Sequence, residues 1–281
     1  MSIDFSVARW AGAVAAGKWP VQDRQLEAAG RALPPILGTV PALGEVHRLD
    51  LALFVVFEEA SLRVSGALVR RAPHASALAF AAQQTLDEAR HHELFRARLL
   101  QTGPRAAASV EAIVTPPLRR FLDHCFEVAD GGSFVEALTL MNLVLEGMAY
   151  PLYSYERRYW APIDPYLAEL VRAAYADETR HVAFGAALVR QLLDDDAAAR
   201  ARAQRACAEA RRALSGVFRH YVKRFVGLFD VVARRHGELF AGAELLPGVR
   251  ISDTPYRDQV ELIERSIEVA HGRLLGRAGL A

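Results

Sequence analysis

Cysteine is scarce in this 281-residue chain, and its two copies, Cys125 and Cys207, lie far apart. They form no Cys-x-x-Cys pair, which excludes a zinc ribbon, a rubredoxin-type centre and a cysteine-ligated iron–sulfur cluster. Two isolated thiols are also typical of a reducing compartment. Because the N-terminus carries Asp4 and Arg9 and lacks the long apolar core of a secretory signal, we expect a cytoplasmic protein.

Long apolar runs and an excess of one charge are absent as well. The most apolar stretch, 137–145, is interrupted by Glu146, and no segment reaches the ~20 apolar residues that a membrane-spanning helix needs. The formal net charge is +1, which gives no reason to expect nucleic acid or an anionic membrane as a partner. Lysine occurs only as Lys18 and Lys223, which we attribute to genomic bias in a chain rich in alanine and arginine.

Alternating strand patterns are missing too, and almost every segment has helical periodicity. Long helices are expected over about 43–71, 76–101, 133–160 and 164–193, with Ser133 and Glu136 forming a capping box at the start of the third. Short helices broken by Pro20, Pro34, Pro35 and Pro41 are expected up to about Pro41, and a shorter helix is expected after Pro116. A long helical tract over about 197–236 is expected to be followed by a Pro/Gly loop at 246–248 and a final helix from about Pro255. The sequence therefore predicts an all-α fold, a four-helix bundle with additional flanking helices. We expect one domain over 1–281, with its core at about 43–193 and C-terminal helices, about 197–275, packed outside.

The pentapeptide Asp-Glu-x-Arg-His occurs twice, at 87–91 and at 177–181, on the second and fourth long helices. Glu and His three positions apart share one face of a helix. An isolated Glu-x-x-His is weak evidence, since Glu268 and His271 also fit the spacing but lack the flanking Asp and Arg. We expect that third copy to be surface helix, whereas the agreement of the two pentapeptides is hard to attribute to chance.

Two further carboxylates come from the first and third long helices. Glu146 stands in an apolar helix, where an unpaired carboxylate would cost several kcal/mol or take up a proton, and a metal cation removes that penalty. The alternative is a buried Glu146 paired with Arg90 or Arg180. On the first helix, helical phase favours Glu58 as the inward residue, because Glu59 falls on a solvated stripe, but the choice between the two stays open.

Six residues are thus candidate ligands for two metal ions. Four carboxylates offset the charge of two divalent cations, and six ligands leave coordination positions open. Mixed oxygen and nitrogen ligation suits iron or manganese better than zinc, so we expect two iron ions, with Mn/Fe as the alternative. The candidates are Glu58, Glu88, His91, Glu146, Glu178 and His181.

With these residues in this order, the chain resembles the ferritin-like di-iron carboxylate superfamily. Both pentapeptides look like those of bacterial multicomponent monooxygenase hydroxylases, and 142–150 is similar to the corresponding helix of ribonucleotide reductase small subunits and related oxidases. The resemblance covers the four core helices. It implies that Asp177 bonds to His91 and Asp87 to His181, because a metal-bound imidazole usually gives its other N–H to a carboxylate. A surface salt bridge to a neighbouring arginine is the alternative for each aspartate.

The resemblance also implies an enzyme that uses O2. We expect a di-iron oxygenase that hydroxylates or N-oxygenates a small organic substrate, with electrons from an external donor, for which a ferredoxin is one option. The arginines of 200–212 could dock an acidic ferredoxin, but a solvated helix face is the favoured explanation for them. A radical-type reductase subunit is disfavoured, because Phe95 stands where that family has a redox-active tyrosine. The alternatives are an Mn/Fe or Fe/Fe oxidase similar to the reductase small subunit, a ferritin-like iron-binding protein without organic substrate, and a non-redox bundle held by salt bridges.

Helical phase predicts which residues surround the open side of the metals. Phe95, Tyr150 and Gly185 follow the ligands by one or two turns and are expected to line a substrate pocket, although a plain core position is the favoured alternative for Phe95. The Tyr150 hydroxyl is expected to point at the metals or the substrate, which makes it the candidate catalytic group. The oligomeric state is left open, with a homodimer as one option.

Overall fold

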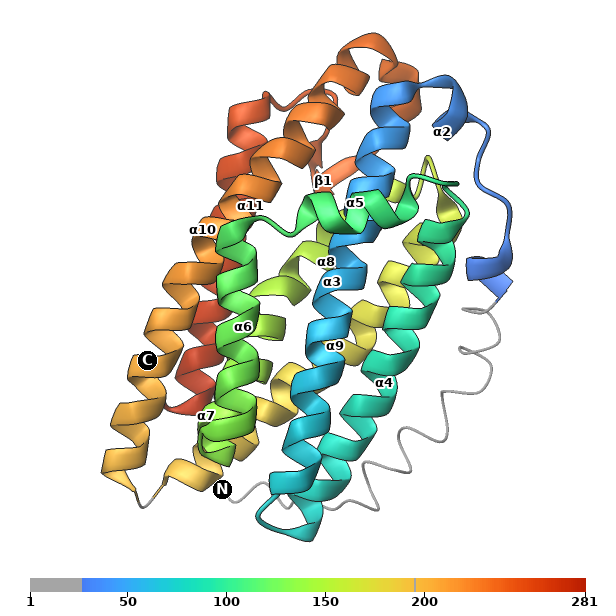
Figure 1. Ribbon diagram of the computed structural model, residues 1–281. Helices are drawn as coiled ribbons and strands as arrows, with labels where there is room; N and C mark the ends of the chain where they lie inside the picture. The colour runs from blue at the N-terminus through green and yellow to red at the C-terminus, as the bar shows by residue number, and fades with distance from the viewer. Residues whose placement is uncertain (1–26, 195) are drawn as a thin grey trace.

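The computed structural model describes residues 27–194 and 196–281, and this part of the chain is almost entirely helical (Figure 1). Four long helical segments form the central bundle. They are α3 (Pro41–Arg71), α4 (Ala75–Leu100), a composite third segment and α9 (Pro165–Leu193). The composite segment joins α7 (Phe134–Leu138), the π-helical turn η1 (Thr139–Leu145) and α8 (Glu146–Trp160) without a break. The prediction of an all-α four-helix bundle is confirmed.

The ends of these helices follow from the residues expected to cap them. The Ser133 hydroxyl accepts from the backbone N–H of Glu136, and the Glu136 carboxylate accepts from the backbone N–H of Ser133, which completes the capping box. Asp164 caps α9 by accepting from the backbone N–H of Leu167. Proline occupies the first turn of α3, of α6 (Pro116–Gly131) and of α9, where its missing N–H leaves no hydrogen bond unmade.

The remaining elements lie around this bundle. They are α2 (Ile36–Thr39), α5 (Ala106–Ile113), α6 (Pro116–Gly131), α10 (Ala197–Arg235), η2 (Gly237–Phe240) and α11 (Tyr256–Ala278). In Figure 1, α5 runs across α3. The helices α6 and α10, the latter 39 residues long, both contact α3. The π turn η1 and α3 both contact α10, whereas α8 and α9 both contact α11. The bundle is therefore covered along one side by the C-terminal helices, and the predicted flanking helices are confirmed.

Two features were not expected from the sequence. The short helix α5 was not predicted, and the segment expected to be only a loop contains a two-stranded hairpin, β1 (Glu244–Leu246) with β2 (Val249–Arg250). Its turn is Pro247-Gly248, with Gly248 at a φ of 80°, and this left-handed conformation favours glycine. Pro20, expected to interrupt an early helix, lies outside the described residues.

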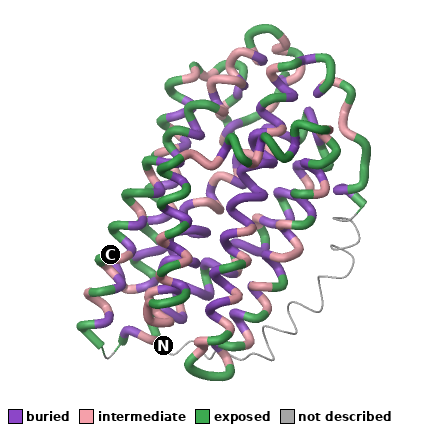
Figure 2. Tube along the Cα trace, viewed as in Figure 1, coloured by how far each residue is buried: buried purple, intermediate pink, exposed green. Residues whose placement is uncertain are grey.

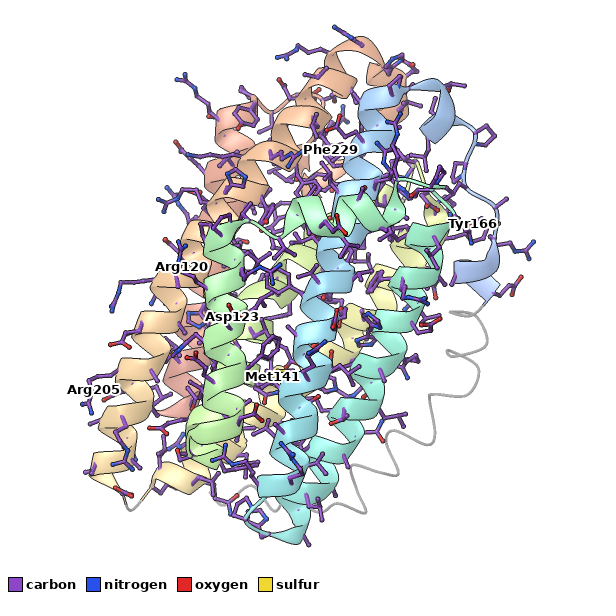
Figure 3. The ribbon with its side chains drawn as sticks, viewed as in Figure 1. Arg120, Asp123, Met141, Tyr166, Arg205 and Phe229 are labelled. Carbon is purple, nitrogen blue, oxygen red and sulfur yellow. The ribbon has the colours of Figure 1, made fainter. Side chains whose placement is uncertain are left out.

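The core is continuous through the bundle and into its contacts with α10 and α11. Buried positions follow the inward faces of the helices, whereas exposed positions gather at the outer faces and the loops (Figure 2). Met141 of η1 is labelled in Figure 3 within this interior and is fully buried. Among the described helices, none is both long enough and apolar enough to cross a bilayer.

A buried ion pair ties the start of α9 to α4. Arg98 donates to both carboxylate oxygens of Asp164 at 2.7 and 2.8 Å, and neither side chain is exposed. The His47 Nε2 lies 2.9 Å from the same carboxylate. Although burial opposes it, the bonds from His47 and Arg98 hold the pKa of Asp164 below its ordinary value. Asp164 therefore caps α9 as an anion that is paired on two sides.

Candidate metal centre

The six candidate ligands lie together inside the bundle, one group from each long segment. Glu58 comes from α3, Glu88 and His91 from α4, Glu146 from the first turn of α8, and Glu178 and His181 from α9. All six are buried, with exposed fractions of 4% or less. Glu59, the alternative to Glu58, lies on the outside of α3 and pairs with Arg63. The structure therefore brings Glu58, and not its neighbour, into the cluster.

The cluster divides into two groups that share two carboxylates. The first contains Glu58, Glu88, His91 and Glu178, and ligand atoms of the four residues all lie within 4.8 Å of one another. The His91 Nδ1 lies 3.2 Å from Glu178, 3.6 Å from Glu58 and 3.7 Å from Glu88. One nitrogen thus faces three carboxylates, which is a donor set suited to a divalent cation.

The second group contains Glu88, Glu146, Glu178 and His181. Here the His181 Nδ1 lies 3.1 Å from Glu88, 3.3 Å from Glu178 and 3.5 Å from Glu146. Glu88 and Glu178 belong to both groups, so each could contribute to two neighbouring ions. Helical bundles build dinuclear carboxylate sites from residues in this arrangement, with the ligands projecting inward from facing helices.

Asp87 and Asp177 lie behind the histidines, crosswise. The His91 Nε2 is 3.1 Å from Asp177, and the His181 Nε2 is 3.2 Å from Asp87. Each aspartate also meets arginine: Arg90 and Arg180 both donate to Asp177, and Arg90 lies 3.4 Å from Asp87. The sequence left open whether each aspartate bonds to a histidine or to an arginine, and in the structure each aspartate contacts both. The arrangement directs the Nδ1 atom of each ring toward the cluster.

Burial in the bundle and the close approach of acidic and basic side chains shift the pKa values of the cluster residues, some upward and some downward. Burial raises the pKa of Glu58 to about 8, and burial together with Glu178 raises the pKa of Glu146. The carboxylates around His91 and His181 outweigh burial and raise the pKa of both rings. Glu88 is buried as well, but the neighbouring His181 and His91 rings hold its pKa below the ordinary value. Acidic groups exceed basic ones, so protons or metal cations must balance the charge.

Buried ligand atoms without hydrogen-bond partners also indicate that this cluster can hold two metal ions. Both oxygens of Glu88, the Oε1 of Glu178 and the Nδ1 of His91 are buried and have no hydrogen-bond partner among the described residues. Buried polar atoms are normally satisfied, and a group of unsatisfied ones in one place calls for an explanation. All four atoms belong to residues of the two ligand groups. Coordination to metal ions would satisfy them together.

Sequence reasoning missed the amides that hold Glu146. Gln84 donates to its Oε1 at 2.6 Å, and Asn142 donates to its Oε2 at 2.9 Å. Both precede a ligand by four residues, a spacing that indicates a shared helical face and was readable from the sequence. Asn142 belongs to η1, whose i→i+5 bonds include the backbone N–H of Glu146 to the carbonyl of Met141. Such π turns are frequent at functional sites.

Two tyrosines of α8 approach the cluster differently. The Tyr153 hydroxyl donates to the Oε1 of Glu58 at 2.7 Å, and the ring is buried. Tyr150, the expected catalytic group, is part-buried, and its ring stacks on Tyr175 with centroids 6.0 Å apart. It lines a small cavity together with Glu58, Glu146 and Glu178, but no hydrogen bond of its hydroxyl is found in the described structure. The direct hydrogen bond to a candidate ligand comes from Tyr153, seven residues after Glu146.

The other two expected pocket residues lie in packed positions. Phe95 is buried and stacks on Phe54 with centroids 4.3 Å apart, which agrees with the alternative of a plain core position. At Gly185, an added Cβ atom would lie 2.3 Å from the Cβ of Asn142. Glycine there allows η1 to approach α9 closely, so this position is filled by Asn142 and not open to a ligand.

The expectation that the third Glu-x-x-His is surface helix is confirmed for Glu268, which is exposed, but is wrong for His271. His271 is 1% exposed, and its Nε2 donates to the carbonyl of Leu143 in η1 at 2.7 Å. Because a π turn shifts the hydrogen-bond pattern, a donor from a neighbouring helix can satisfy a carbonyl that the turn exposes. Burial, partly offset by this bond, lowers the pKa of His271 to about 4, so the ring is neutral at pH 7.

We expect His271→Phe to loosen η1 and thereby weaken metal binding by the second group of ligands. The variant leaves the Leu143 carbonyl buried without its donor, which costs about 1–3 kcal/mol. A lower Tm and a reduced content of the second metal ion per chain would be measured by thermal unfolding and elemental analysis. Equal metal content in the variant and the parent protein would show that η1 keeps its shape without His271.

The fold defined by these helices is that of the ferritin-like proteins. One similar solved structure is an R2-like ligand-binding oxidase mutant with a reconstituted Fe/Fe cofactor, at TM-score 0.65 and 17% identity over 96% of this chain and 94% of that one. Another is a mutant with an Mn/Fe cofactor, at TM-score 0.67 and 17% identity over 98% and 94%. No family model matches the chain, and a search of curated proteins finds no match either. The likeness confirms the predicted ferritin-like fold.

Proposed function

We propose that this protein is an O2-activating oxidase or oxygenase with a dinuclear metal centre, Fe/Fe or Mn/Fe, and a small organic substrate. The observation that carries the proposal is the pair of ligand groups sharing Glu88 and Glu178, in which four buried ligand atoms have no hydrogen-bond partner among the described residues. The similar solved structures carry Fe/Fe or Mn/Fe cofactors, which supports the same metals here. When bound, these metals would supply the redox chemistry that O2 activation requires.

The residues of the chain have separate roles in this proposal. Glu58 and His91 would bind one ion, Glu146 and His181 the other, and Glu88 and Glu178 both. Asp177 and Asp87 would keep the proton of each imidazole on Nε2, so that Nδ1 remains free for a metal. Gln84 and Asn142 would fix the orientation of the Glu146 carboxylate, and the Tyr153 hydroxyl that of Glu58.

A non-redox bundle held by salt bridges agrees less well with the contacts. That alternative requires Arg90 or Arg180 to neutralise the buried glutamates. Both arginines pair with the aspartates instead, and Glu146 accepts from two neutral amides. The four glutamates are therefore left to be neutralised by protons or metals.

The proposal is tested by anaerobic reconstitution with Fe(II), alone and with Mn(II), followed by exposure to O2. We expect about two metal ions per chain, an optical change on oxidation and consumption of O2 without growth of an iron mineral. Continued Fe(II) oxidation far beyond two ions per chain would favour the iron-storage alternative. A folded protein that holds no pair of metals would overturn the proposal.

Two tyrosine variants separate the roles of Tyr150 and Tyr153. We expect Tyr153→Phe to change the optical spectrum of the oxidised centre and to lower turnover about ten-fold, because Glu58 loses its donor. Tyr150→Phe, the matched variant one turn earlier, should have a smaller effect unless its hydroxyl reaches the metals or the substrate. If Tyr150→Phe leaves both turnover and spectrum unchanged, the catalytic role predicted for it fails.

The electron donor would be a separate protein, and a basic patch on α10 is the candidate docking site. Of its arginines, Arg200 donates to backbone carbonyls and Arg202 lies 3.6 Å from Glu136. Arg205 is exposed and projects from α10 (Figure 3). Arg212 is exposed as well. The free charge is thus smaller than the sequence indicated. A reducing, cytoplasmic setting is part of the proposal, supported by the buried free thiols of Cys125 and Cys207.

A further inference from the structure

Three neighbouring cavities follow α8 away from the metal centre. The cavity at Glu58, Glu146 and Glu178 shares Phe57, Ala149 and Tyr153 with a second cavity. The second shares Asp50, Leu53, Leu152, Glu156 and Phe218 with a third. Because neighbouring cavities have walls in common, modest side-chain movement would join them into one site. The third cavity lies between α8, α10 and α11.

The far end of this series is aromatic and acidic. Two carboxylates, Asp50 from α3 and Glu156 from α8, stand among aromatic rings. Phe229, labelled in Figure 3, is one of the rings contributed by α10, and its ring stacks on Tyr159 at 5.0 Å. Aromatic faces carry negative potential and attract organic cations, especially where a carboxylate is also present. The rings are those of Tyr155, Tyr159, Phe218, Tyr221, Phe225 and Phe229.

Two polar atoms at this end have no partner within the described structure. The Oε2 of Glu156 and the hydroxyl of Tyr159 are both shielded from solvent and make no hydrogen bond, and the Tyr159 residue is only 6% exposed. Asp50 accepts from the indole N–H of Trp160 at 2.5 Å. No arginine, lysine or histidine within the described ranges forms an ion pair with Asp50 or Glu156, although other buried carboxylates have such partners. The carboxyl groups of Asp50 and Glu156 therefore have no cationic partner among the described residues.

We propose that Glu156, Asp50 and the surrounding rings bind the ammonium group of an amphiphilic amine whose apolar body extends through the cavities toward the metals. Glu156 follows Glu146 by ten residues and Asp50 precedes Glu58 by eight, which places the cationic group about 12–15 Å along the helices from the metal centre. The substrate class is then an organic ammonium with an apolar body, oxidised at the end remote from its nitrogen. Its role as substrate rests on the proposed function, but its binding does not.

An organic cation fits this site better than a metal ion does. Within the described structure, Asp50 and Glu156 form no group of three metal-ligating side chains, whereas the six residues of the metal centre do. The lining is otherwise mostly apolar and aromatic, so a strongly hydrated metal ion would lose its water without gaining enough oxygen ligands. An ammonium needs only one or two carboxylates and the faces of the rings.

Binding is tested on the full chain, as purified and after metal reconstitution, with three probes of equal length. We expect n-octylammonium to bind about ten-fold more tightly than neutral n-octanol, and octanoate to bind most weakly, measured by titration calorimetry. In Glu156→Gln the octylammonium affinity should fall about ten-fold while the octanol affinity stays the same. Glu59→Gln, an exposed carboxylate on the outside of α3, is the matched control and should change neither.

The outcomes separate this inference from the proposed function. If octylammonium binds no better than octanol, or if Glu156→Gln weakens both equally, the cationic site is disproved even where two metals are present. If the ammonium preference is found in protein that holds no metal pair, the binding site stands and only its role as a substrate site fails. The comparison of the three probes on the unaltered chain decides the matter even if the variant does not fold.

A pH experiment tests the same pair of carboxylates through stability. Burial raises the pKa of Asp50 to about 7, and burial and Asp50 together raise the pKa of Glu156. The titratable groups facing them are Tyr155 and Tyr159 from α8 and Tyr221 from α10. Since both folded-state pKa values exceed the unfolded ones, the contribution to stability is fully present below about pH 4 and is lost as pH rises through the folded values.

We therefore expect Glu156→Gln to raise the Tm by about 2–4 °C at pH 8 and by less at pH 5, because glutamine cannot become a buried anion. The measurement is thermal unfolding of both proteins across that range without added amine. A Tm difference that does not grow with pH would mean that Glu156 is not buried as a neutral acid. In that case the uncompensated carboxylate on which the ammonium site depends would be absent.

Discussion

Glu178→Gln is expected to reduce the metal content of the protein from about two ions per chain to less than one. Glu178 belongs to both ligand groups, and its Oε1 is buried without a hydrogen-bond partner. Glutamine keeps the size of the side chain but removes the charge and the ability to bridge two cations. Metal content is measured by elemental analysis after reconstitution and removal of loosely bound ions.

Glu58→Gln provides the sharpest comparison for this prediction. Glu58 belongs to the first group only, so this variant should retain about one ion, whereas Glu59→Gln on the outside of the same helix should retain two. Tm should follow the metal content, because a ligand at 100 times its Kd stabilises the folded state by about 2.7 kcal/mol. If all three variants hold two ions, these glutamates are not the ligands.

Arg98→Met is expected to destabilise the folded protein by about 3–5 kcal/mol. The variant leaves Asp164 buried without its arginine, and breaking one side of a buried ion pair is costly because the remaining charge is uncompensated. Asp164 also caps α9, the helix that carries Glu178 and His181, so the loss should extend to metal affinity. Denaturant unfolding of the metal-free proteins gives the stability difference directly.

Arg172→Met is the matched control for Arg98→Met. Arg172 lies on α9 and pairs with Glu169, but the pair is largely exposed, and exposed pairs contribute roughly 0–1 kcal/mol. A loss in Arg98→Met no larger than in Arg172→Met would show that the protein relaxes around Asp164 or admits water to it. The ion pair would then have no special part in holding α9.

The helices were readable from the sequence because their signals are local. Ser133 with Glu136, and Asp164 before Pro165, mark helix starts by residues that lie within one turn of the backbone they cap. The paired pentapeptides located four of the six candidate ligands, since i and i+3 share a face on any regular helix. Phase also favoured Glu58 over Glu59 because α3 is one continuous helix there.

Predictions from helical phase were less accurate for residues that follow the π turn and for residues whose surroundings come from another helix. Tyr150 and Tyr153 both lie on the side of Glu146, and only the packing of α8 against α3 gives Tyr153 the hydrogen bond to Glu58. Gly185 has the right phase for a pocket but is covered by Asn142 of η1. His271 was expected at the surface because nothing in its own helix indicates that η1 presents it with a carbonyl.

By itself, the sequence determined that the chain is helical, where most helices begin and end, and which acidic and imidazole side chains could share a helix face. These properties depend on contacts between near neighbours. Only the tertiary structure decided which faces meet: that Glu88 and Glu178 belong to both ligand groups, that the aspartates cross to the opposite histidines, and that Asp50 and Glu156 share an aromatic cavity. Those pairings join residues up to about a hundred positions apart, and packing, not local propensity, sets them.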